Sequence, residues 1–367
     1  MLKPYLPEQM PVSMDKWNMN RMLIKLSNAS SALAYYDGIL TSMINASIFL
    51  SPLATREAIL SSKIEGTVTT MDEVLKFEAG MKPINPHKQN DIIEVLNYRK
   101  ATIYAQDWLK RGMPFNTTML CAIHRSLMQG VRGENKRPGE IRQEMVWIGP
   151  KECAIEQATY LPPEPGGLKQ ELDKLMAFAA RQDQENLLQT ALLHAQFELL
   201  HPFLDGNGRT GRILIPLFLW HKKKLHTPSF YISEYFDINR DDYLNTLSSI
   251  PRKGNWEEWI LFFLDAIAIQ ASSNAKKASQ VLELYASMKD RITEISRSPN
   301  AIHILDTLFN MPVFSSRGFM KSSGLNSQTS FRMLQKLKVS GILSTIRKPM
   351  GSAPEILRFD KLYRLVR

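Results

Sequence analysis

Residues 201–212 limit most strongly what this chain can fold into. At their centre, Gly206-Asn207-Gly208 can adopt backbone angles that a Cβ resists, so consecutive N–H groups can converge on an anion. Residues 210–220 then show the apolar spacing of a helix, and the N-terminus of a helix attracts phosphate. The stretch therefore predicts a turn that opens onto a helix and binds an anion such as a triphosphate.

The polar side chains around this turn suit a triphosphate. Asp205 precedes the turn, where its carboxylate can hold Mg²⁺ together with phosphate oxygens and water. Arg209 and Arg212 lie three residues apart, so both guanidinium groups can face the phosphates. His201 suits a general base because the pKa of histidine lies near neutrality. Its place at the end of a predicted helix, residues 186–200, favours the imidazolium form through the helix dipole, so other neighbours must tune it.

These residues resemble the signature of the Fic (filamentation induced by cyclic AMP) family, His-x-Phe-x-Asp/Glu-Gly-Asn-Gly-Arg-x-x-Arg, at every fixed position. The resemblance implies a protein adenylyltransferase, which transfers AMP from Mg-ATP to a hydroxyl side chain of a target protein or of itself. The resemblance implies that His201 is the base that deprotonates the hydroxyl and that Asp205 is the Mg²⁺ ligand. It also implies that Gly206, Asn207 and Gly208 form the phosphate cradle and that Arg209 and Arg212 bind the triphosphate.

A second motif lies far ahead of the signature. Residues 54–65 predict a helix that stops at Gly66, with Ser61 and Glu65 four residues apart on one face. A carboxylate in the last turn opposes the helix dipole at a cost of about 0.3 to 1 kcal/mol, so folding alone does not favour Glu65 there. The stretch resembles the inhibitory motif of regulated Fic proteins, Ser/Thr-x-x-x-Glu-Gly/Asn. That resemblance implies that Glu65 pairs with Arg212, blocks the γ-phosphate position and makes the enzyme auto-inhibited.

Two β-prone runs, residues 146–150 and 158–163, predict a hairpin before the signature. An ordinary surface hairpin is one interpretation. The resemblance to Fic proteins implies instead a flap that holds a target segment as an added strand beside His201. The docking edge is then either the first run or the second: Trp147, Ile148 and Gly149, or Thr159, Tyr160 and Leu161.

Three further aromatic or imidazole side chains are assigned from their positions. Residues 231–243 resemble the Fic segment that closes the adenine end of the pocket, which implies that Tyr243 stacks on adenine. His124 and His194 lie on predicted helices, and we interpret both as structural because a lone helical histidine is more often a packed residue than a ligand.

The charge of the chain is concentrated at its end. The formal net charge is +10, which permits binding to nucleic acid, ATP or acidic proteins without choosing among them. Residues 299–367 carry eleven Lys and Arg against three Asp and Glu. A helix at 327–339 followed by strands at 341–345 and 355–359 predicts a winged helix-turn-helix. Duplex DNA binding and protein docking or dimerisation both remain open, because the helix offers few base-reading side chains.

The expected fold is therefore mainly α: a Fic-type helical core with a small β-hairpin flap, plus a C-terminal winged helix-turn-helix. The expected domains are a helical region with the inhibitory motif at 1–110, the catalytic core at 111–298 and the winged helix at 299–367. The N-terminus has no apolar signal core, and no stretch is long and apolar enough for a membrane span, so we expect a cytoplasmic protein without a membrane partner.

Several functions remain open beside AMP transfer. The same site could remove AMP from a modified protein, with Glu65 activating water, or use another donor such as CDP-choline. From a different class, the protein could be a DNA-binding regulator that only senses a nucleotide. A homodimer is compatible with each of these functions.

Overall fold

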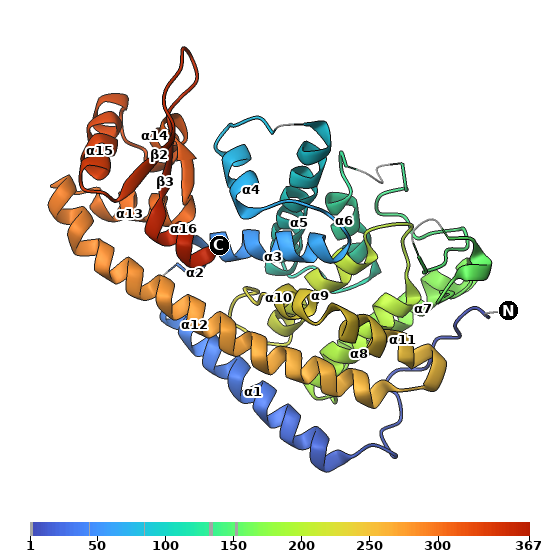
Figure 1. The fold of residues 1–367 in the computed structure, drawn as a ribbon. Coiled ribbons are helices and arrows are strands. Elements are labelled where there is room, and N and C mark those ends of the chain that lie inside the picture. Colours follow the sequence, from blue (N-terminus) through green and yellow to red (C-terminus); the bar gives the residue numbers. More distant parts are fainter. Residues whose placement is uncertain (1–2, 44, 84, 132–134, 151–152) are drawn as a thin grey trace.

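The computed structural model describes residues 3–43, 45–83, 85–131, 135–150 and 153–367, and within these the fold is mainly α-helical with one three-stranded sheet (Figure 1). The elements in chain order are α1 (Met19–Ser42), α2 (Ala46–Phe49), α3 (Ser51–Ile64), α4 (Met71–Glu78), α5 (Pro86–Lys110), α6 (Thr117–Leu127), η1 (Ile155–Gln157), η2 (Pro165–Gly167), α7 (Leu168–Ala180), α8 (Asn186–Leu200), α9 (Asn207–His221), α10 (Ser233–Ile238), α11 (Arg240–Lys253), α12 (Trp256–Ser296), α13 (Ala301–Asn310), β1 (Val313–Ser315), α14 (Ser316–Ser323), α15 (Ser327–Val339), β2 (Leu343–Arg347), β3 (Ile356–Phe359) and α16 (Asp360–Val366).

Two long helices, α1 and α12, lie side by side along one edge of the molecule (Figure 1). The 41 residues of α12 span about 60 Å at 1.5 Å per residue, which carries the chain from the central helices to the C-terminal region. Lys25 and Asp265 join the two helices by an ion pair of 2.5 Å. The pair α1 and α12 therefore forms a frame against which the other helices pack.

The centre of the fold is formed by α8 and α9. Both helices are buried on nearly all sides, as expected for helices that are apolar around their whole circumference. They are joined by the short loop that contains the signature residues, so this loop is held between two helices of the core. Helices α3, α5, α6 and α7 surround them. The loop is thereby supported by two deeply buried helices.

The C-terminal region contains the sheet. The strands lie in the order β1-β3-β2 and are antiparallel, with Val313 opposite Arg358 and Leu343 opposite Phe359. Helix α15 has the bounds predicted for it, and the loop between β2 and β3 projects from the molecule (Figure 1). The order of helices and strands agrees with that expected of a winged helix, although the winged-helix assignment itself and the boundaries of the three domains stay predictions.

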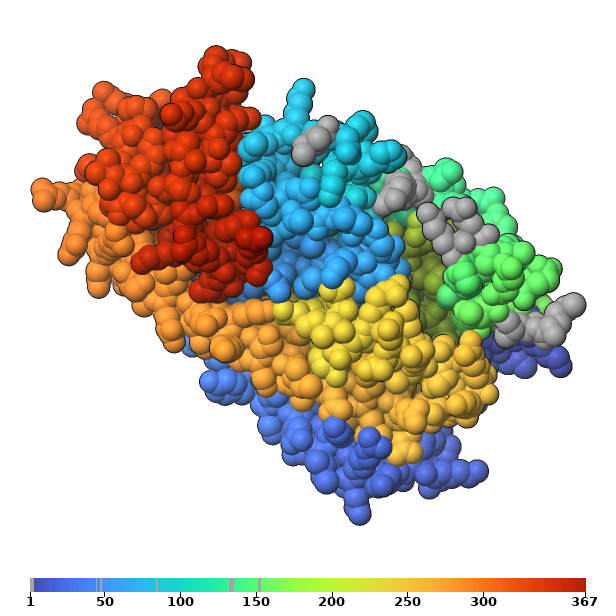
Figure 2. Space-filling model, in the orientation of Figure 1, coloured from blue at the N-terminus to red at the C-terminus, as the bar shows by residue number. Residues whose placement is uncertain are grey.

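This C-terminal region contacts the N-terminal helices, and the two surfaces adjoin in Figure 2. Phe49 packs against the rings of Tyr285 and Phe309, with centroid distances of 4.5 and 6.1 Å. The hydroxyl of Tyr363 donates a hydrogen bond to Asp72. Within the described ranges, no helix is long and apolar enough to cross a bilayer.

Candidate active site

The loop between α8 and α9 is closed by its own side chains. His201 follows α8 in the left-handed region at φ 47°, and Gly206 precedes α9 at φ 75°. Asn207 accepts a hydrogen bond from the Phe203 N–H and donates one to the Phe203 carbonyl, both at 2.8 Å. Helix α9 begins at Asn207, three residues earlier than predicted, so the signature glycines belong to its first turn and its cap.

His124 supports this loop from α6. Its ring lies flat on Phe203, with centroids 3.8 Å apart and planes within 2°. Nδ1 accepts from the Gly139 N–H at 2.8 Å, so Nε2 carries the proton and donates to the Asp205 carbonyl at 2.8 Å. Burial lowers the pKa of His124 to about 4, so the ring is neutral. Its contacts are those of a residue that holds the loop in place.

The two signature glycines are required for different reasons. Gly206 has the left-handed backbone that the turn predicts, whereas Gly208 has helical angles. A Cβ on Gly208 would lie 2.1 Å from Oε1 of Glu65 and 2.9 Å from Nη1 of Arg212. The expected backbone angles that a Cβ resists are therefore found at Gly206 and not at Gly208, where the absence of a Cβ makes room for the carboxylate of Glu65.

His201 is neutral in the folded protein. Burial lowers its pKa to about 4, although the Glu198 carbonyl, 3.4 Å from Nδ1, acts in the opposite direction. The helix dipole alone would favour imidazolium, and the sequence therefore predicted that other neighbours tune His201; here burial is the larger influence and lowers the pKa. A proton on Nδ1 faces the Glu198 carbonyl and leaves the lone pair of Nε2 available, which is the form that a general base requires.

Arg212 brings the two distant motifs together. Its guanidinium, 1% exposed, donates from Nε to Oγ of Ser61 at 2.8 Å, and from Nη2 to the Ser61 carbonyl at 2.8 Å and to Oε1 of Glu65 at 2.7 Å. Helix α3 ends just before Glu65, and Gly66 turns the chain away at φ 95°. Burial raises the pKa of Glu65, but the guanidinium of Arg212 more than offsets it, so Glu65 is a carboxylate at neutral pH.

Arg209 and Asp205 form a second charged group. Nη2 of Arg209 lies 3.5 Å from Oδ1 of Asp205, and Nη1 lies 3.5 Å from Oε2 of Glu94, which also accepts from the Thr67 hydroxyl at 2.6 Å. Arg209 is buried, while Asp205 is half-exposed. Asp205 is therefore held by Arg209 and by its own loop, where Oδ1 accepts from the Gly206 N–H.

Three carboxylic acids near the site were missed by the sequence analysis. Glu94 holds Arg209, as described above. Glu57 on α3 is buried and accepts from the N–H and hydroxyl of Ser233 at 3.0 and 2.6 Å, and burial raises its pKa to about 7. Glu198 on α8 packs against Gly211, and burial raises its pKa to about 8. In the sequence, Glu198 could have been noticed as an acidic residue within a helix whose other residues are mostly apolar.

Tyr243 does not present an open face for adenine. It is 2% exposed, and Phe236 stacks on its ring with centroids 4.4 Å apart. Its hydroxyl lies 3.0 Å from Nε2 of His194, whose Nδ1 lies 3.1 Å from the Gly211 carbonyl. Tyr243 therefore lies in the aromatic core behind α9, and His194 has the structural position predicted for it.

The flap is shorter than the predicted hairpin. Among the described residues it has one isolated antiparallel bridge, between Ile148 and Tyr160, with Ile148 N–H donating to the Tyr160 carbonyl at 2.9 Å. A Cβ on Gly149 would lie 2.7 Å from Sγ of Cys153, so the turn is tightly packed. The predicted pairing of the two runs is present only as this bridge, and the described residues between them include η1 and lie close to Gly149.

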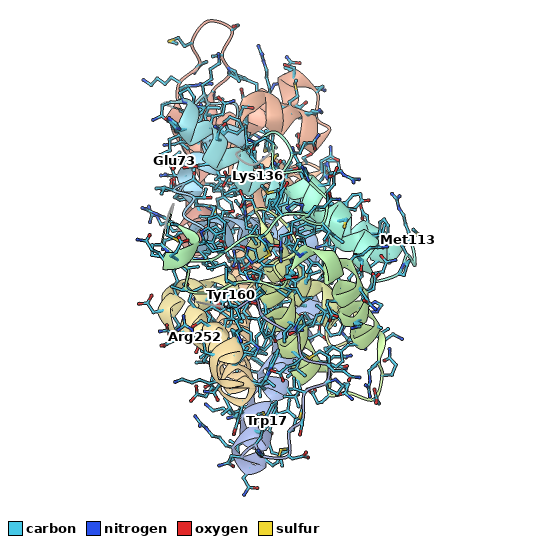
Figure 3. The ribbon with its side chains drawn as sticks, turned by 90° about the vertical axis from the view of Figure 1, so that its right-hand side faces the viewer. Trp17, Glu73, Met113, Lys136, Tyr160 and Arg252 are labelled. Carbon is cyan, nitrogen blue, oxygen red and sulfur yellow. The ribbon has the colours of Figure 1, made fainter. Side chains whose placement is uncertain are left out.

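The two edges of the flap differ. Leu161 already accepts from the Tyr5 N–H at 2.9 Å and Thr159 from Arg252 at 3.0 Å, and Tyr160 and Arg252 come from neighbouring segments (Figure 3). Tyr160 is buried and donates its hydroxyl to the Leu199 carbonyl at 2.6 Å. Trp147, in contrast, is 42% exposed. Of the two predicted docking edges, the one at residues 147–149 is therefore the accessible one.

Comparison with known proteins agrees with this geometry. Two family models match the chain, Fic/DOC family N-terminal over residues 23–107 and Fic/DOC family over residues 114–219, and together they cover more than half of it. The protein adenylyltransferase Fic of Drosophila ananassae is 24% identical over 159 residues, and that of Drosophila grimshawi is 25% identical over 160. Each match covers 42% of this chain and 30% or 31% of the relative, so the chain matches under a third of the length of these relatives.

Two solved structures share the fold. A Fic family protein from Desulfovibrio desulfuricans G20 has a TM-score of 0.56 at 20% identity and covers 98% of both chains. Fic-1 from C. elegans has a TM-score of 0.52 at 17% identity and covers 74% of this chain and 79% of its own. At this identity the likeness shows the fold alone.

Proposed function

Because the chain is a Fic domain protein of the Fic/DOC family, we propose that it is a protein adenylyltransferase that transfers AMP from ATP to a hydroxyl of a target protein or of itself. The hydroxyl oxygen bonds to the α-phosphorus, and the bond from this phosphorus to the β-phosphate oxygen breaks, so pyrophosphate leaves. The observation that carries the proposal is the group of residues on one loop and one helix end: a neutral His201, a half-exposed Asp205, the first turn of α9 and Arg212. The related sequences named protein adenylyltransferase support the same reaction.

The chain supplies a base and an anion site. Nε2 of His201 takes the proton of the incoming hydroxyl, and the flap edge at residues 147–149 holds the segment that carries this hydroxyl. The first N–H groups of α9 lack acceptors inside the helix and attract phosphate oxygens. Arg212 adds a guanidinium that binds two oxygens at once. Together these groups hold a nucleotide tail while the hydroxyl is activated.

The residues present fit a Mg²⁺ ion held mainly by its substrate. Asp205 offers one half-exposed carboxylate, and Oδ2 is without a hydrogen-bond partner among the described residues. No group of three or more His, Cys, Asp and Glu in that part of the chain could hold a metal. One carboxylate completed by phosphate oxygens and water is typical of Mg²⁺. When bound with ATP, the ion would neutralise charge on the phosphates.

We propose that Glu65 inhibits this reaction in the resting protein. Its carboxylate lies against Gly208 in the first turn of α9 and pairs with Arg212, which is the position that an anionic phosphate would take. A phosphate and the carboxylate cannot both occupy it. Because the Glu65 side chain is 38% exposed and follows the end of α3, it can be displaced without unfolding the helix.

Mass spectrometry of the purified protein after incubation with Mg-ATP tests the reaction. The Glu65→Gly variant is expected to gain the mass of one or more AMP groups, and adding His201→Ala to it should abolish the gain. If the Glu65→Gly variant binds an ATP analogue and stays unmodified with added protein substrates, AMP transfer is contradicted. If CDP-choline gives a mass gain and ATP gives none, the donor is CDP-choline and not ATP.

We also propose duplex DNA as a partner of the C-terminal region. The exposed face of α15 carries a hydroxyl, an amide and a guanidinium, which can contact phosphates and a few base edges: Ser327, Gln328 and Arg332. The nucleotide-sensing regulator is the function that this surface would serve. It predicts duplex binding that changes with nucleotide, without a covalent product.

A further inference from the structure

Arg142 is a buried cation with an unusual set of partners. It lies between α6 and the flap, and its side chain is 2% exposed. In the described part of the chain, each hydrogen bond that this side chain donates ends on a backbone carbonyl oxygen. A buried guanidinium without a carboxylate is costly, so its hydrogen bonds must be well made.

The carbonyl groups belong to three separate segments. Nε donates to His201 at 2.8 Å, and Nη2 donates to Leu200 at 3.4 Å, both at the end of α8. Nη1 donates to Glu144 at 3.0 Å, on the arm that enters the flap. Nη2 also donates to Pro163 at 2.6 Å, on the arm that leaves it. One rigid, planar group therefore connects both arms of the flap to the residue that carries the imidazole.

Two more contacts strengthen this connection. The backbone N–H of Arg142 donates to the Pro202 carbonyl at 2.9 Å, and Tyr160 donates to the Leu199 carbonyl at 2.6 Å. The last carbonyl groups of a helix have no partner inside it. Here the carbonyl groups from Leu199 to Pro202 all accept from Arg142 or Tyr160, so the flap region satisfies the end of α8.

The charge of Arg142 also acts on the imidazole. It lowers the pKa of His201 in the same direction as burial, which is the larger cause. Burial in turn lowers the pKa of Arg142 itself, which remains a cation at neutral pH because the ordinary value is far above it. The positive charge therefore helps to keep the base free of its proton.

We propose that Arg142 is a positioning residue that sets the distance between His201 and a hydroxyl docked on the flap. It touches none of the reacting groups and acts through the carbonyl groups that it binds. The role of Arg142 in AMP transfer rests on the proposed function. The connection between the flap and the imidazole is a property of the fold and can be measured separately.

Hydrogen–deuterium exchange tests the connection without any activity. In Arg142→Lys, the N–H groups of Ile148 and Thr159 in the flap should exchange about 10-fold faster or more, as expected when hydrogen bonds to a charged donor are lost. Lys222→Met is the matched control, because Lys222 is also buried and donates to a carbonyl, that of Arg181. Equal exchange in Arg142→Lys and the parent would overturn the proposal, as would equal acceleration in Lys222→Met.

Labelling in the Glu65→Ala background gives the second measurement. Arg142→Lys should bind a fluorescent ATP analogue as the parent does and label itself about 10-fold more slowly, with the label spread over different hydroxyls. Arg142→Met, which also loses the charge, should shift the acid limb of the rate profile to higher pH. If the labelling rate, the labelled hydroxyls and the acid limb of the pH–rate profile are all unchanged, the proposal is overturned. A parent that never labels would contradict AMP transfer alone, and the exchange result would still decide the role of Arg142.

Discussion

Removal of the Glu65 carboxylate should raise self-labelling by a predictable amount. The perturbation is Glu65→Ala, which deletes the 2.7 Å hydrogen bond to Arg212 and the anion against Gly208. A hydrogen bond to a charged group contributes about 1.5 to 3 kcal/mol. Because Glu65 is 38% exposed and partly screened by water, we take the lower end of that range, about 1.5 kcal/mol, which corresponds to about a 10-fold rise in rate.

The assay is incorporation of a labelled ATP analogue into the purified protein at subsaturating nucleotide, where the competition with Glu65 is visible. Glu65→Gln keeps the size of the side chain and one acceptor oxygen, so its rise should be smaller, about 3-fold, as for a neutral in place of a charge-assisted hydrogen bond. Glu294→Ala is the control, because Glu294 is an exposed acid on α12. If Glu65→Ala labels at the rate of Glu294→Ala, the inhibitory role is refuted.

A companion experiment separates transfer from removal. Protein already carrying AMP is incubated without nucleotide, and loss of the label is followed in the parent and in Glu65→Gln. If Glu65 only blocks the phosphate position, both should keep the label. Rapid loss in the parent that disappears in Glu65→Gln would assign the water-activating role instead.

Three other outcomes are expected. His201→Ala should abolish labelling. As the pH is lowered, the labelling rate of Glu65→Ala should stay constant through about pH 6.5, the ordinary pKa of histidine, and fall only towards the pKa of about 4 that burial gives His201. A fall centred near pH 6.5 would contradict a neutral base. Gly208→Ala should destabilise the parent by about 1 to 3 kcal/mol through the clash with Glu65 and much less in the Glu65→Ala background; urea unfolding of all four proteins measures the coupling, and additive effects would disprove the contact. Filter binding of duplex DNA at two salt concentrations should show an affinity that falls with salt and weakens in Arg332→Ala; affinity without a salt slope would remove DNA as the partner.

The parts of the site that are short and linear could be predicted from the sequence. The pairing of Glu65 with Arg212 joins residues 147 positions apart, and it was expected because each residue belongs to a short motif that resembles one of the Fic family. The turn at Gly206 was also predicted, because glycine adopts left-handed backbone angles readily, although the helix begins three residues earlier than expected.

The contacts that hold those motifs could not be predicted. Arg142 meets His201 and Pro163 only because the flap folds back on the end of α8, and nothing local in residues 138–146 specifies those partners. The same is true of Glu94, which reaches Arg209 from α5. The sequence predicted that neighbours must tune His201 but could not identify them, because the helix dipole is visible in the sequence and the depth of burial is not.

Tyr243 was assigned to the nucleotide pocket from its sequence position, but it lies in the core. An aromatic residue on an amphipathic helix packs in the core more often than it stacks on a ligand, and here Phe236 already covers its ring. The flap was also predicted with two strands because both runs are β-prone. A single bridge is present instead, and the outer edge of residues 159–161 accepts hydrogen bonds from Tyr5 and Arg252.

The Glu65 carboxylate beside Gly208 also stabilises the protein when no nucleotide is bound. Arg212 is a cation enclosed by the core and paired with Glu65, and removing one partner of a buried ion pair destabilises a fold because the other charge is left without compensation. Glu65 provides the compensating anion whenever nucleotide is absent. Variants freed from inhibition should therefore melt at a lower temperature than the parent when empty and recover when ATP is added, so the restraint on catalysis is at the same time a contribution to the stability of the unliganded chain.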